Sequence, residues 1–348
     1  MRFYTGQHQH YCGIDLHART MYLCIQDKEG KVLLHRNLPC DRARFVEAIE
    51  PFRDDLVVAS ECIFDWYWLA DLCAEHEIPF VLGHALYMKA IHGAKAKNDP
   101  IDSLKTASLL RGGLLPQAYA YPAAMLPTRD LLRRRTHFVR KRGQLLAHIQ
   151  NTFHRYKLPR PQGVLIYRGN RASVPETFTD PIVRKSIEAD LALCDTYDAL
   201  IRDLEKTVLA QARIQEPNTL LCLNTIPGIG KILALTFLYE IHDIGRFESV
   251  QRFASYARLV KCEKSSAGKR SGSSGSKIGK GHLKWAFSEA AATVLSHFPE
   301  SKKLHGRLKR KFGKGKAMSI LAHKIGRTVY FMLKRNQAFD PARFLANT

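Results

Sequence analysis

Short apolar runs alternate with turn-like breaks in the first part of the chain. β-Prone runs at 11–16, 21–26 and 31–38 are divided by breaks such as Lys28-Glu29-Gly30, which predicts three successive strands. A helix from Asp41 to about Phe52, a buried strand at 56–59, a helix at 66–76 and a strand at 79–82 are expected to follow. The pattern predicts a mixed α/β domain at residues 1–125.

Beyond Pro122 and Pro127, apolar residues recur every seven positions. Two long helices are expected in this part of the chain. The repeating positions are Leu132, Val139, Leu146 and Phe153 in the first helix, and Ile187, Cys194, Ile201 and Val208 in the second. Heptads of this length indicate a helical coiled-coil hairpin or a dimerising arm at 126–215. Packing of both helices inside one bundle is a nearly equal alternative.

The third part, 216–348, has helical periodicity with one interruption. Residues Ser265 to Gly281 are rich in Ser, Gly, Lys and Arg and have no apolar period, as is typical of a mobile linker. Helices are expected to resume at 283–296 and at 317–333. The predicted fold class is therefore α/β plus all-α, with a helical C-terminal domain.

The net charge of the chain indicates what kind of partner it binds. The 348 residues include 54 Lys and Arg but only 32 Asp and Glu, which gives a formal net charge of +22. The cations cluster in runs such as Arg133-Arg134-Arg135 and Arg140-Lys141-Arg142, beside helical apolar positions. A clustered excess of this size favours a nucleic-acid partner over simple solvation.

The cysteines and the hydropathy of the chain indicate its cellular compartment. The eight cysteines include no C-x-x-C pair, which argues against structural zinc. The first residues carry no signal-peptide pattern, and about 18 consecutive apolar residues occur nowhere. We therefore expect a reduced, cytoplasmic protein with no membrane partner.

Four acidic residues are candidates for a metal centre in the first domain. The order β-β-β-α-β-α-β is that of a ribonuclease H-like sheet. Asp15 lies inside the first predicted strand, where a carboxylate is costly unless it is paired or bound to metal. Glu61 follows the strand at 56–59, and Asp99 and Asp102 share one face at a helix start. Oxygen ligands of this kind suit Mg²⁺ or Mn²⁺.

Asp99 and Asp102 also have a purely structural explanation. In Asn98-Asp99-Pro100-Ile101-Asp102, Pro100 suits the first helical position and Asp99 suits the N-cap. Asp102 would then be favoured by the helix dipole. Taken alone this explanation is the stronger one, but Asp15 has no equivalent, and four acids at suitable points of one sheet favour metal binding.

A turn at residues 225–231 predicts contact with a nucleic-acid backbone. Thr225-Ile226-Pro227-Gly228-Ile229-Gly230-Lys231 has the form of a helix-hairpin-helix connection, in which glycines permit close approach and helix-start N–H groups bind phosphate. A merely tight connection between helices is the alternative. The chain has no GxxxxGK[ST] loop, so no nucleotide cofactor is expected.

Lys264-Ser265-Ser266-Ala267-Gly268-Lys269-Arg270 places serines among cations. A serine in such a setting could act as a nucleophile, although chemistry alone favours a mobile linker. The predicted nucleic-acid-binding residues are Gly228, Gly230, Lys231, Lys269, Arg270, Lys277, Arg133, Arg134 and Arg140.

These motifs, in this order, resemble the transposases of the insertion sequence 110 family, the DEDD serine recombinases guided by a bridge RNA. The N-terminal resemblance lies in Gly13-Ile14-Asp15, Ser60-Glu61 and the segment 97–102. The C-terminal resemblance lies in the segments 226–230, 258–260, 266–269, 275–279 and 282–287. Lys280 departs from the family pattern, because Asn is frequent there.

The resemblance implies a RuvC-like domain with a metal-binding tetrad, a coiled-coil arm and a C-terminal domain with a catalytic serine. Ser266 aligns best with that serine, and Ser265 is the adjacent alternative. It further implies cutting and rejoining of donor and target DNA, a phosphoserine intermediate, an element-encoded bridge RNA and a homo-oligomer, dimer or tetramer. The expected location is the interior of a bacterial or archaeal cell, on nucleoid DNA.

Two other functions are compatible with the residues. A Holliday-junction resolvase-like nuclease would use the same acids with water as the nucleophile. A non-catalytic nucleic-acid-binding scaffold would need only the basic helices. Substitution of Ser266 separates the first from a recombinase, and substitution of Asp15 separates the second from either enzyme.

Overall fold

The computed structural model describes residues 2–91, 98–159, 161, 163–266, 269–274 and 278–346. Contacts divide the chain into two compact units, Met1–Ala124 and Met125–Thr348. Each unit has its own buried apolar core. No helix among the described residues is long and apolar enough to cross a membrane.

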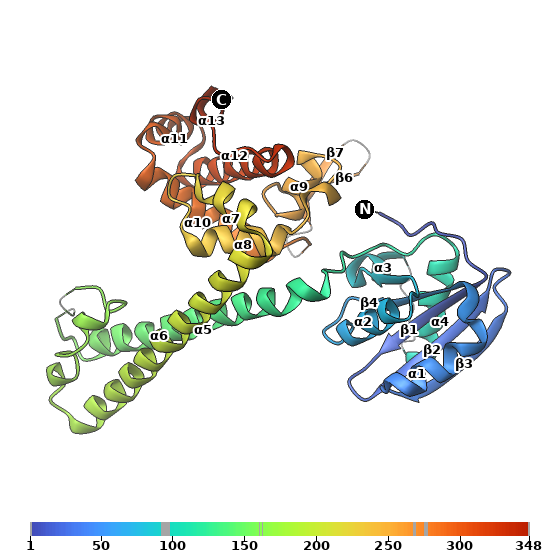
Figure 1. Cartoon of the computed structure of the whole chain (residues 1–348). Helices are drawn as coiled ribbons and strands as arrows, with labels where there is room; N and C mark the ends of the chain where they lie inside the picture. Colours follow the sequence, from blue (N-terminus) through green and yellow to red (C-terminus); the bar gives the residue numbers. More distant parts are fainter. Residues whose placement is uncertain are drawn as a thin grey trace. The chain divides into compact units, whose positions relative to one another are not determined.

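The first unit is built on a mixed five-stranded sheet (Figure 1). Its strands are β1 His10–Leu16, β2 Thr20–Asp27, β3 Val32–Pro39, β4 Leu56–Glu61 and β5 Phe80–Gly83. Their order in the sheet is β3-β2-β1-β4-β5, with the meander antiparallel and β1, β4 and β5 parallel. The sheet confirms the predicted element order, because each expected strand is present.

Helices cover both faces of this sheet. They are α1 Arg42–Ile49, α2 Tyr67–Glu75, α3 Ala85–Ile91 and α4 Asp99–Arg111, with a 3-10 turn at Glu50–Asp55. Asp41 caps α1 as predicted, since its carboxylate accepts a hydrogen bond from the Arg44 N–H at 3.0 Å. Helix α4 packs on β1 and β2, while buried Cys12 lies near Cys73 of α2 on the other face.

Helix α4 lies unusually close to strand β1. A Cβ at Gly13 would stand 2.2 Å from the Ala107 nitrogen and 2.5 Å from the Ser103 oxygen, both backbone atoms of α4. No side chain fits in this space, so only glycine permits the contact. The same strand face carries Asp15 two residues later, which brings Asp15 under the first turn of α4.

The second unit begins with two long helices that pack along each other (Figure 1). They are α5 Leu126–Arg155 and α6 Pro181–Gln215, and most of the predicted heptad residues are buried between them. Ion pairs also join the two helices: Arg135 to Glu205 at 2.6 Å, Arg142 to Asp198, and His148 to Asp190 at 2.5 Å. Whether this pair serves as a dimerising arm stays a prediction.

The rest of the second unit is largely helical. Its helices are α7 Pro217–Asn224, α8 Lys231–Ile241, α9 Val250–Tyr256, α10 Gly281–His297, α11 Pro299–Phe312, α12 Lys314–Arg335 and α13 Pro341–Ala346. Further 3-10 turns lie at Ala123–Met125, Arg168–Asn170, Pro175–Thr177 and Ile244–Arg246. Helix α11 was not expected, because its dense cations hide a short apolar stripe around Leu304.

The expectation of an irregular linker after Ser265 is partly wrong. Strands β6 Cys262–Ser266 and β7 Lys269–Ser274 pair as an antiparallel hairpin with an irregularity between Lys264 and Ser265. Backbone pairing between strands does not require an apolar period in the sequence, so the pattern of residues did not reveal the hairpin.

Substitution of Gly13 by Ala is expected to destabilise the first unit by at least about 2 kcal/mol, because a methyl group would force α4 away from β1. Urea unfolding of the two proteins measures this difference. Gly143→Ala in α5 is the matched control: a Cβ there meets nothing within 4 Å, so we expect a gain of about 0.5–1 kcal/mol. Equal stabilities of Gly13→Ala and wild type would contradict the packing argument.

Candidate active site

Two of the predicted acids lie at the carboxyl ends of neighbouring parallel strands. Asp15 is the penultimate residue of β1, and Glu61 is the last residue of β4. The register pairs Ile14 with Ser60, so Asp15 and Glu61 are the next residues along the two strands. The sheet therefore places both carboxylates at one edge, as the carboxyl ends of parallel strands require.

The other two acids come from the start of α4. Asn98, and not Asp99, is the N-cap: its side chain accepts a hydrogen bond from the Ile101 N–H at 3.0 Å. The capping explanation for Asp99 is therefore wrong, and Pro100 is the second helical residue. Asp102 lies one turn into the helix, where its carboxylate is 3.5 Å from the Lys105 ammonium. Asp99 is the first residue of the helix, where its charge is favoured by the helix dipole.

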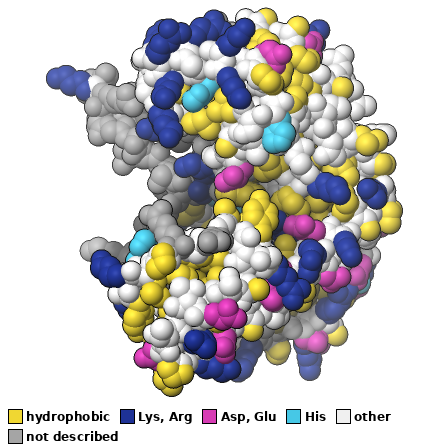
Figure 2. Space-filling view, turned by 90° about the vertical axis from the view of Figure 1, so that its left-hand side faces the viewer, with side chains coloured by type: hydrophobic (Ala, Val, Ile, Leu, Met, Phe, Trp, Pro, Cys, Tyr) yellow, Lys and Arg dark blue, Asp and Glu magenta, His cyan; other side chains and the backbone are white. Residues whose placement is uncertain are grey.

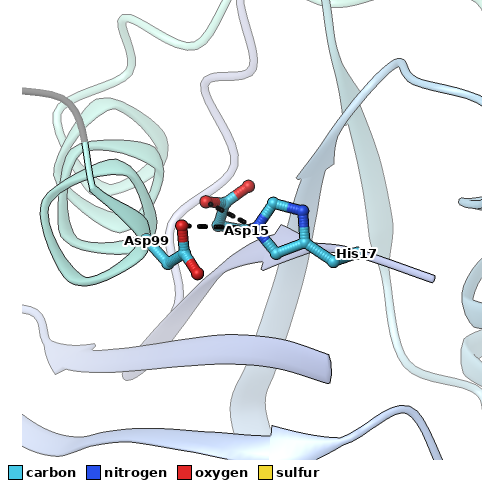
Figure 3. A group of neighbouring side chains, drawn as sticks. All are labelled: Asp15, His17 and Asp99. Carbon is cyan, nitrogen blue, oxygen red and sulfur yellow. Dashed lines mark ion pairs between the residues drawn. The ribbon is translucent and has the colours of Figure 1, made fainter. Parts of the chain in front are cut away.

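His17 joins Asp15 to Asp99 (Figure 3). Its Nε2 lies 3.5 Å from a carboxylate oxygen of Asp15 and 3.3 Å from one of Asp99. Ligand atoms of the three residues lie within 4.8 Å of one another, the spacing that a single metal ion needs. The structure thus brings together a strand residue and a helix residue some eighty positions apart in sequence.

Sequence reasoning overlooked His17. Alternate residues of an extended strand point to the same side, so Asp15-x-His17 places both side chains on one face. That spacing was a usable signal. It was missed because His17 lies just beyond the predicted strand, which ends at Leu16.

The pKa of the Asp15 carboxyl is altered by its neighbours in the site. Burial raises the pKa of the Asp15 carboxyl; His17 acts in the opposite direction, and the negative charges of Asp99, Asp102 and Glu61 raise the pKa further. Each of the three other acids is therefore close enough to oppose ionisation of Asp15. Four carboxylates gathered in this way need positive charge among them.

The donor set fits a divalent cation. Asp15 and Asp99 offer hard oxygen ligands, His17 offers a nitrogen, and Glu61 and Asp102 add negative charge within electrostatic range. A bound ion would relieve the repulsion that raises the pKa of Asp15. Which of the four acids are direct ligands stays a prediction.

The predicted nucleophile lies in the second unit. Ser266 is the last residue of β6 and pairs with Lys269 across the hairpin, while Ser265 pairs with Arg270. The side chains of Ser265, Ser266 and Arg270 and the whole of Lys277 lie outside the described residues. The described backbone therefore brings a serine and a cation opposite each other at the hairpin tip.

The predicted backbone-binding turn joins α7 to α8. Gly228 has a φ of +81°, and a Cβ there would lie 2.6 Å from the Thr293 oxygen of α10, so this glycine serves packing within the unit. Gly230 is the exposed N-cap of α8, and exposed Lys231 follows. Gly230 and Lys231 are thus accessible to a ligand, whereas Gly228 faces α10.

Comparison with known proteins agrees with this arrangement. Residues 12–157 match the DEDD transposase model of the insertion sequence 110 type, described as "Transposase". Residues 221–306 match a second model, "Transposase IS116/IS110/IS902 family". The chain belongs to this family of transposases.

One curated relative spans nearly the whole transposase chain. It is the transposase for insertion sequence element IS1111A of Coxiella burnetii (strain RSA 493 / Nine Mile phase I), 23% identical over 338 residues, covering 94% of this chain and 90% of the relative. The protein is thus a DNA transposase with a DEDD catalytic domain, a phosphoryl-transfer enzyme. A DEDD domain implies a divalent metal, in agreement with the acids described above.

The predicted DNA-binding arginines of the transposase differ in their surroundings. Arg134 and Arg140 are exposed on α5. Arg133 makes a bidentate ion pair with Glu240 of α8, at 2.7 and 2.8 Å. Glu240 is nearly inaccessible to solvent, with 2% of its side chain exposed. Arg133 therefore stabilises the fold of the unit. A role in binding DNA stays a prediction for Arg133, Arg134 and Arg140.

The Glu240 carboxylate also binds the segment that follows the β6–β7 hairpin, which we call the serine hairpin because it carries Ser265 and Ser266. The Lys280 ammonium lies 3.4 Å from Glu240, directly before α10. Two further hydrogen bonds close the base of the hairpin: Arg258 Nε donates to the Ile278 oxygen at 2.9 Å, and the Lys280 N–H donates to the Tyr256 oxygen at 2.6 Å. Lys280, the residue that departs from the family pattern, thus takes part in the ion pair with Glu240.

Glu240→Gln is expected to destabilise the second unit by about 3–5 kcal/mol at pH 7, since Arg133 and Lys280 would lose their buried counter-charge. Glu188→Gln is the matched control. Its partner is Lys185 in an exposed ion pair of α6, and we expect a loss of no more than about 1 kcal/mol. Urea unfolding gives both values.

The Glu240 contribution depends on pH in a defined direction. Although burial acts to raise it, hydrogen bonding from Arg133 and the charge of Lys280 lower the pKa of Glu240 to about 2, below the ordinary glutamate value of 4.5. The stabilisation is complete above pH 4.5 and is lost as the pH falls towards 2. The stability difference between wild type and Glu240→Gln should shrink across this window; a constant difference would contradict the assignment.

Proposed function

We propose that this transposase cuts and rejoins DNA through a serine nucleophile, assisted by divalent metal at the acidic tetrad. The observation that carries the proposal is the convergence of Asp15, Glu61, Asp99 and Asp102 at one sheet edge, where three carboxylates oppose ionisation of the fourth. Metal bound there supplies the positive charge that a phosphodiester and its leaving oxygen need. The family to which the chain belongs acts on DNA, which supports the same substrate.

In the proposed reaction the Ser266 hydroxyl oxygen attacks a DNA phosphorus. The new P–O bond to serine forms as the bond to the 3′ oxygen breaks, so the serine loses its proton and the 3′ oxygen gains one. The phosphoserine ester conserves the energy of the phosphodiester, which allows a second strand's 3′ hydroxyl to reverse the step and restore serine. Lys269 pairs with Ser266 across the hairpin, and its charge would neutralise the phosphate in this reaction.

Ser266→Ala is expected to abolish strand cleavage and rejoining, with a loss of at least about 1000-fold in rate, because no hydroxyl remains to form the ester. The measurement is a cleavage assay with labelled DNA, with denaturing gels to trap a covalent protein–DNA adduct. Ser265→Ala is the adjacent control and should retain the adduct. Undiminished cleavage by Ser266→Ala, with no adduct in wild type, would indicate a resolvase-like nuclease that uses water.

We also propose that an element-encoded bridge RNA pairs with donor and target DNA, and that the chain acts as a homo-oligomer, dimer or tetramer. Both follow from the family resemblance, and the net charge of +22 is compatible with an RNA partner. Sequencing of RNA that copurifies with the protein tests the guide. We expect one dominant transcript from the element's own flanks; ribosomal and transfer RNA in proportion to their cellular abundance would contradict the proposal.

A further inference from the structure

Helix α12 borders two adjoining grooves on the surface of the second unit. The first, of about 990 Å³, lies between α12, α13 and Leu308 of α11. The second, of about 560 Å³, lies between the start of α12 and residues 259–261. Both are lined by Ile320 and His323, so together they form one trough along α12. We call this surface the α12 trough.

Cations and aromatic rings alternate along the α12 trough. Arg327, Phe331 and Arg335 are spaced four apart and therefore lie on one face of α12. The Arg335 guanidinium lies 5.0 Å from the centre of the Phe331 ring, and the Lys324 ammonium lies 5.4 Å from that of Phe344. The trough thus offers positive charge together with flat apolar surface.

The charge of the α12 trough is unbalanced. Among its lining residues in the described chain, the one acid is Asp340, which already pairs with Arg343 at 3.3 Å. Burial lowers the pKa of Lys324, and the neighbouring positive charges of Arg327 and Arg307 lower it further. Lys and Arg side chains gather with hydrophobic side chains between them at the top of Figure 2, where Asp and Glu side chains are fewer.

The trough runs to the root of the serine hairpin. Its far end is lined by Leu259, Val260 and Lys261, and β6 begins at the next residue. Gly326 fixes this end, since a Cβ there would stand 2.3 Å from the Leu259 side chain. From Lys316 to Arg335 the helix extends about 28 Å, the length of roughly eight nucleotides of a stacked strand.

We infer that the α12 trough binds a single strand of nucleic acid, with its phosphates on Arg327 and Arg335 and an unpaired base on Phe331. Arg327 and Arg335 lie two turns apart, about 12 Å, on one helix face, so each can meet a different phosphate. The partly exposed Phe331 ring between them suits an unpaired base better than a closed duplex. Binding in the trough does not depend on the serine nucleophile. Delivery of that strand to the hairpin rests on the proposed function.

The test is fluorescence anisotropy with 20-nucleotide single-stranded DNA, single-stranded RNA and duplex DNA, using the full chain. Arg327→Gln/Arg335→Gln should weaken single-strand binding at least 10-fold and reduce the salt slope of log K by about 1.4. Lys302→Gln/Lys303→Gln on exposed positions of α11 removes the same charge and should weaken binding less than 2-fold. The single strand that binds more tightly identifies the ligand as DNA or RNA.

Phe331→Leu keeps an apolar side chain but removes the ring, and should weaken single-strand binding about 5-fold while leaving duplex binding unchanged. Hydrogen exchange on the wild-type protein gives an independent readout, with protection expected in α12 and at 259–261. Equal effects of the two double variants, or no protection of α12, would overturn the inference. Ser266→Ala should retain this binding, so failure of the serine proposal and failure of the trough give different results.

Discussion

The contact between the backbones of α4 and β1 at Gly13 is the constraint on which the candidate site depends. A Cβ there would lie 2.2 Å from an α4 nitrogen, so this approach is open to glycine alone. The close approach sets the first turn of α4 over the end of β1. Asp99 and Asp102 on the helix then meet Asp15 on the strand, and β4 adds Glu61 from the side. Gly13, which offers no ligand itself, thus controls whether the four acids meet.

A second constraint of the same kind operates in the C-terminal unit. The buried Glu240 binds Arg133 of α5 and Lys280 at the start of α10 through its two oxygens. It therefore joins the long helices to the segment that follows the serine hairpin. The arginines of α5 serve two purposes: Arg133, Arg135 and Arg142 pair with acids of the unit, whereas Arg134 and Arg140 are exposed. The large net charge is therefore only partly available to DNA.

Much of the first unit could be predicted because strands buried on both faces of a sheet appear in the sequence as continuous apolar runs. The strands around Ile14 and Val58 are apolar runs between turn signals, and Asp15 is conspicuous as a carboxylate within one of them. The α12 face was visible as helical periodicity. His17 was missed because its spacing carries meaning only once the strand's end is known.

Other features depend on contacts between distant segments and leave little local signal. The β6–β7 hairpin is held by backbone pairing and by hydrogen bonds at its base, such as that from Arg258 to Ile278, so its Ser- and Gly-rich residues resemble a linker. Helix α11 has few apolar residues among its many cations, so its apolar stripe was overlooked in the sequence. The choice of Asn98 over Asp99 as the cap of α4 depends on backbone angles that the sequence leaves open.

The most direct measurement for the acidic centre is calorimetric titration of Mn²⁺ into the full chain and into Asp15→Asn, with Asp54→Asn, an exposed carboxylate of the same unit, as the control. Asp15→Asn should weaken Mn²⁺ binding at least about 10-fold. Its metal-free form should also melt at a higher temperature, because burial and the three neighbouring carboxylates oppose ionisation of Asp15. Asp54→Asn should match wild type in both respects. Unchanged Mn²⁺ affinity in Asp15→Asn would contradict the account of these acids as a metal centre.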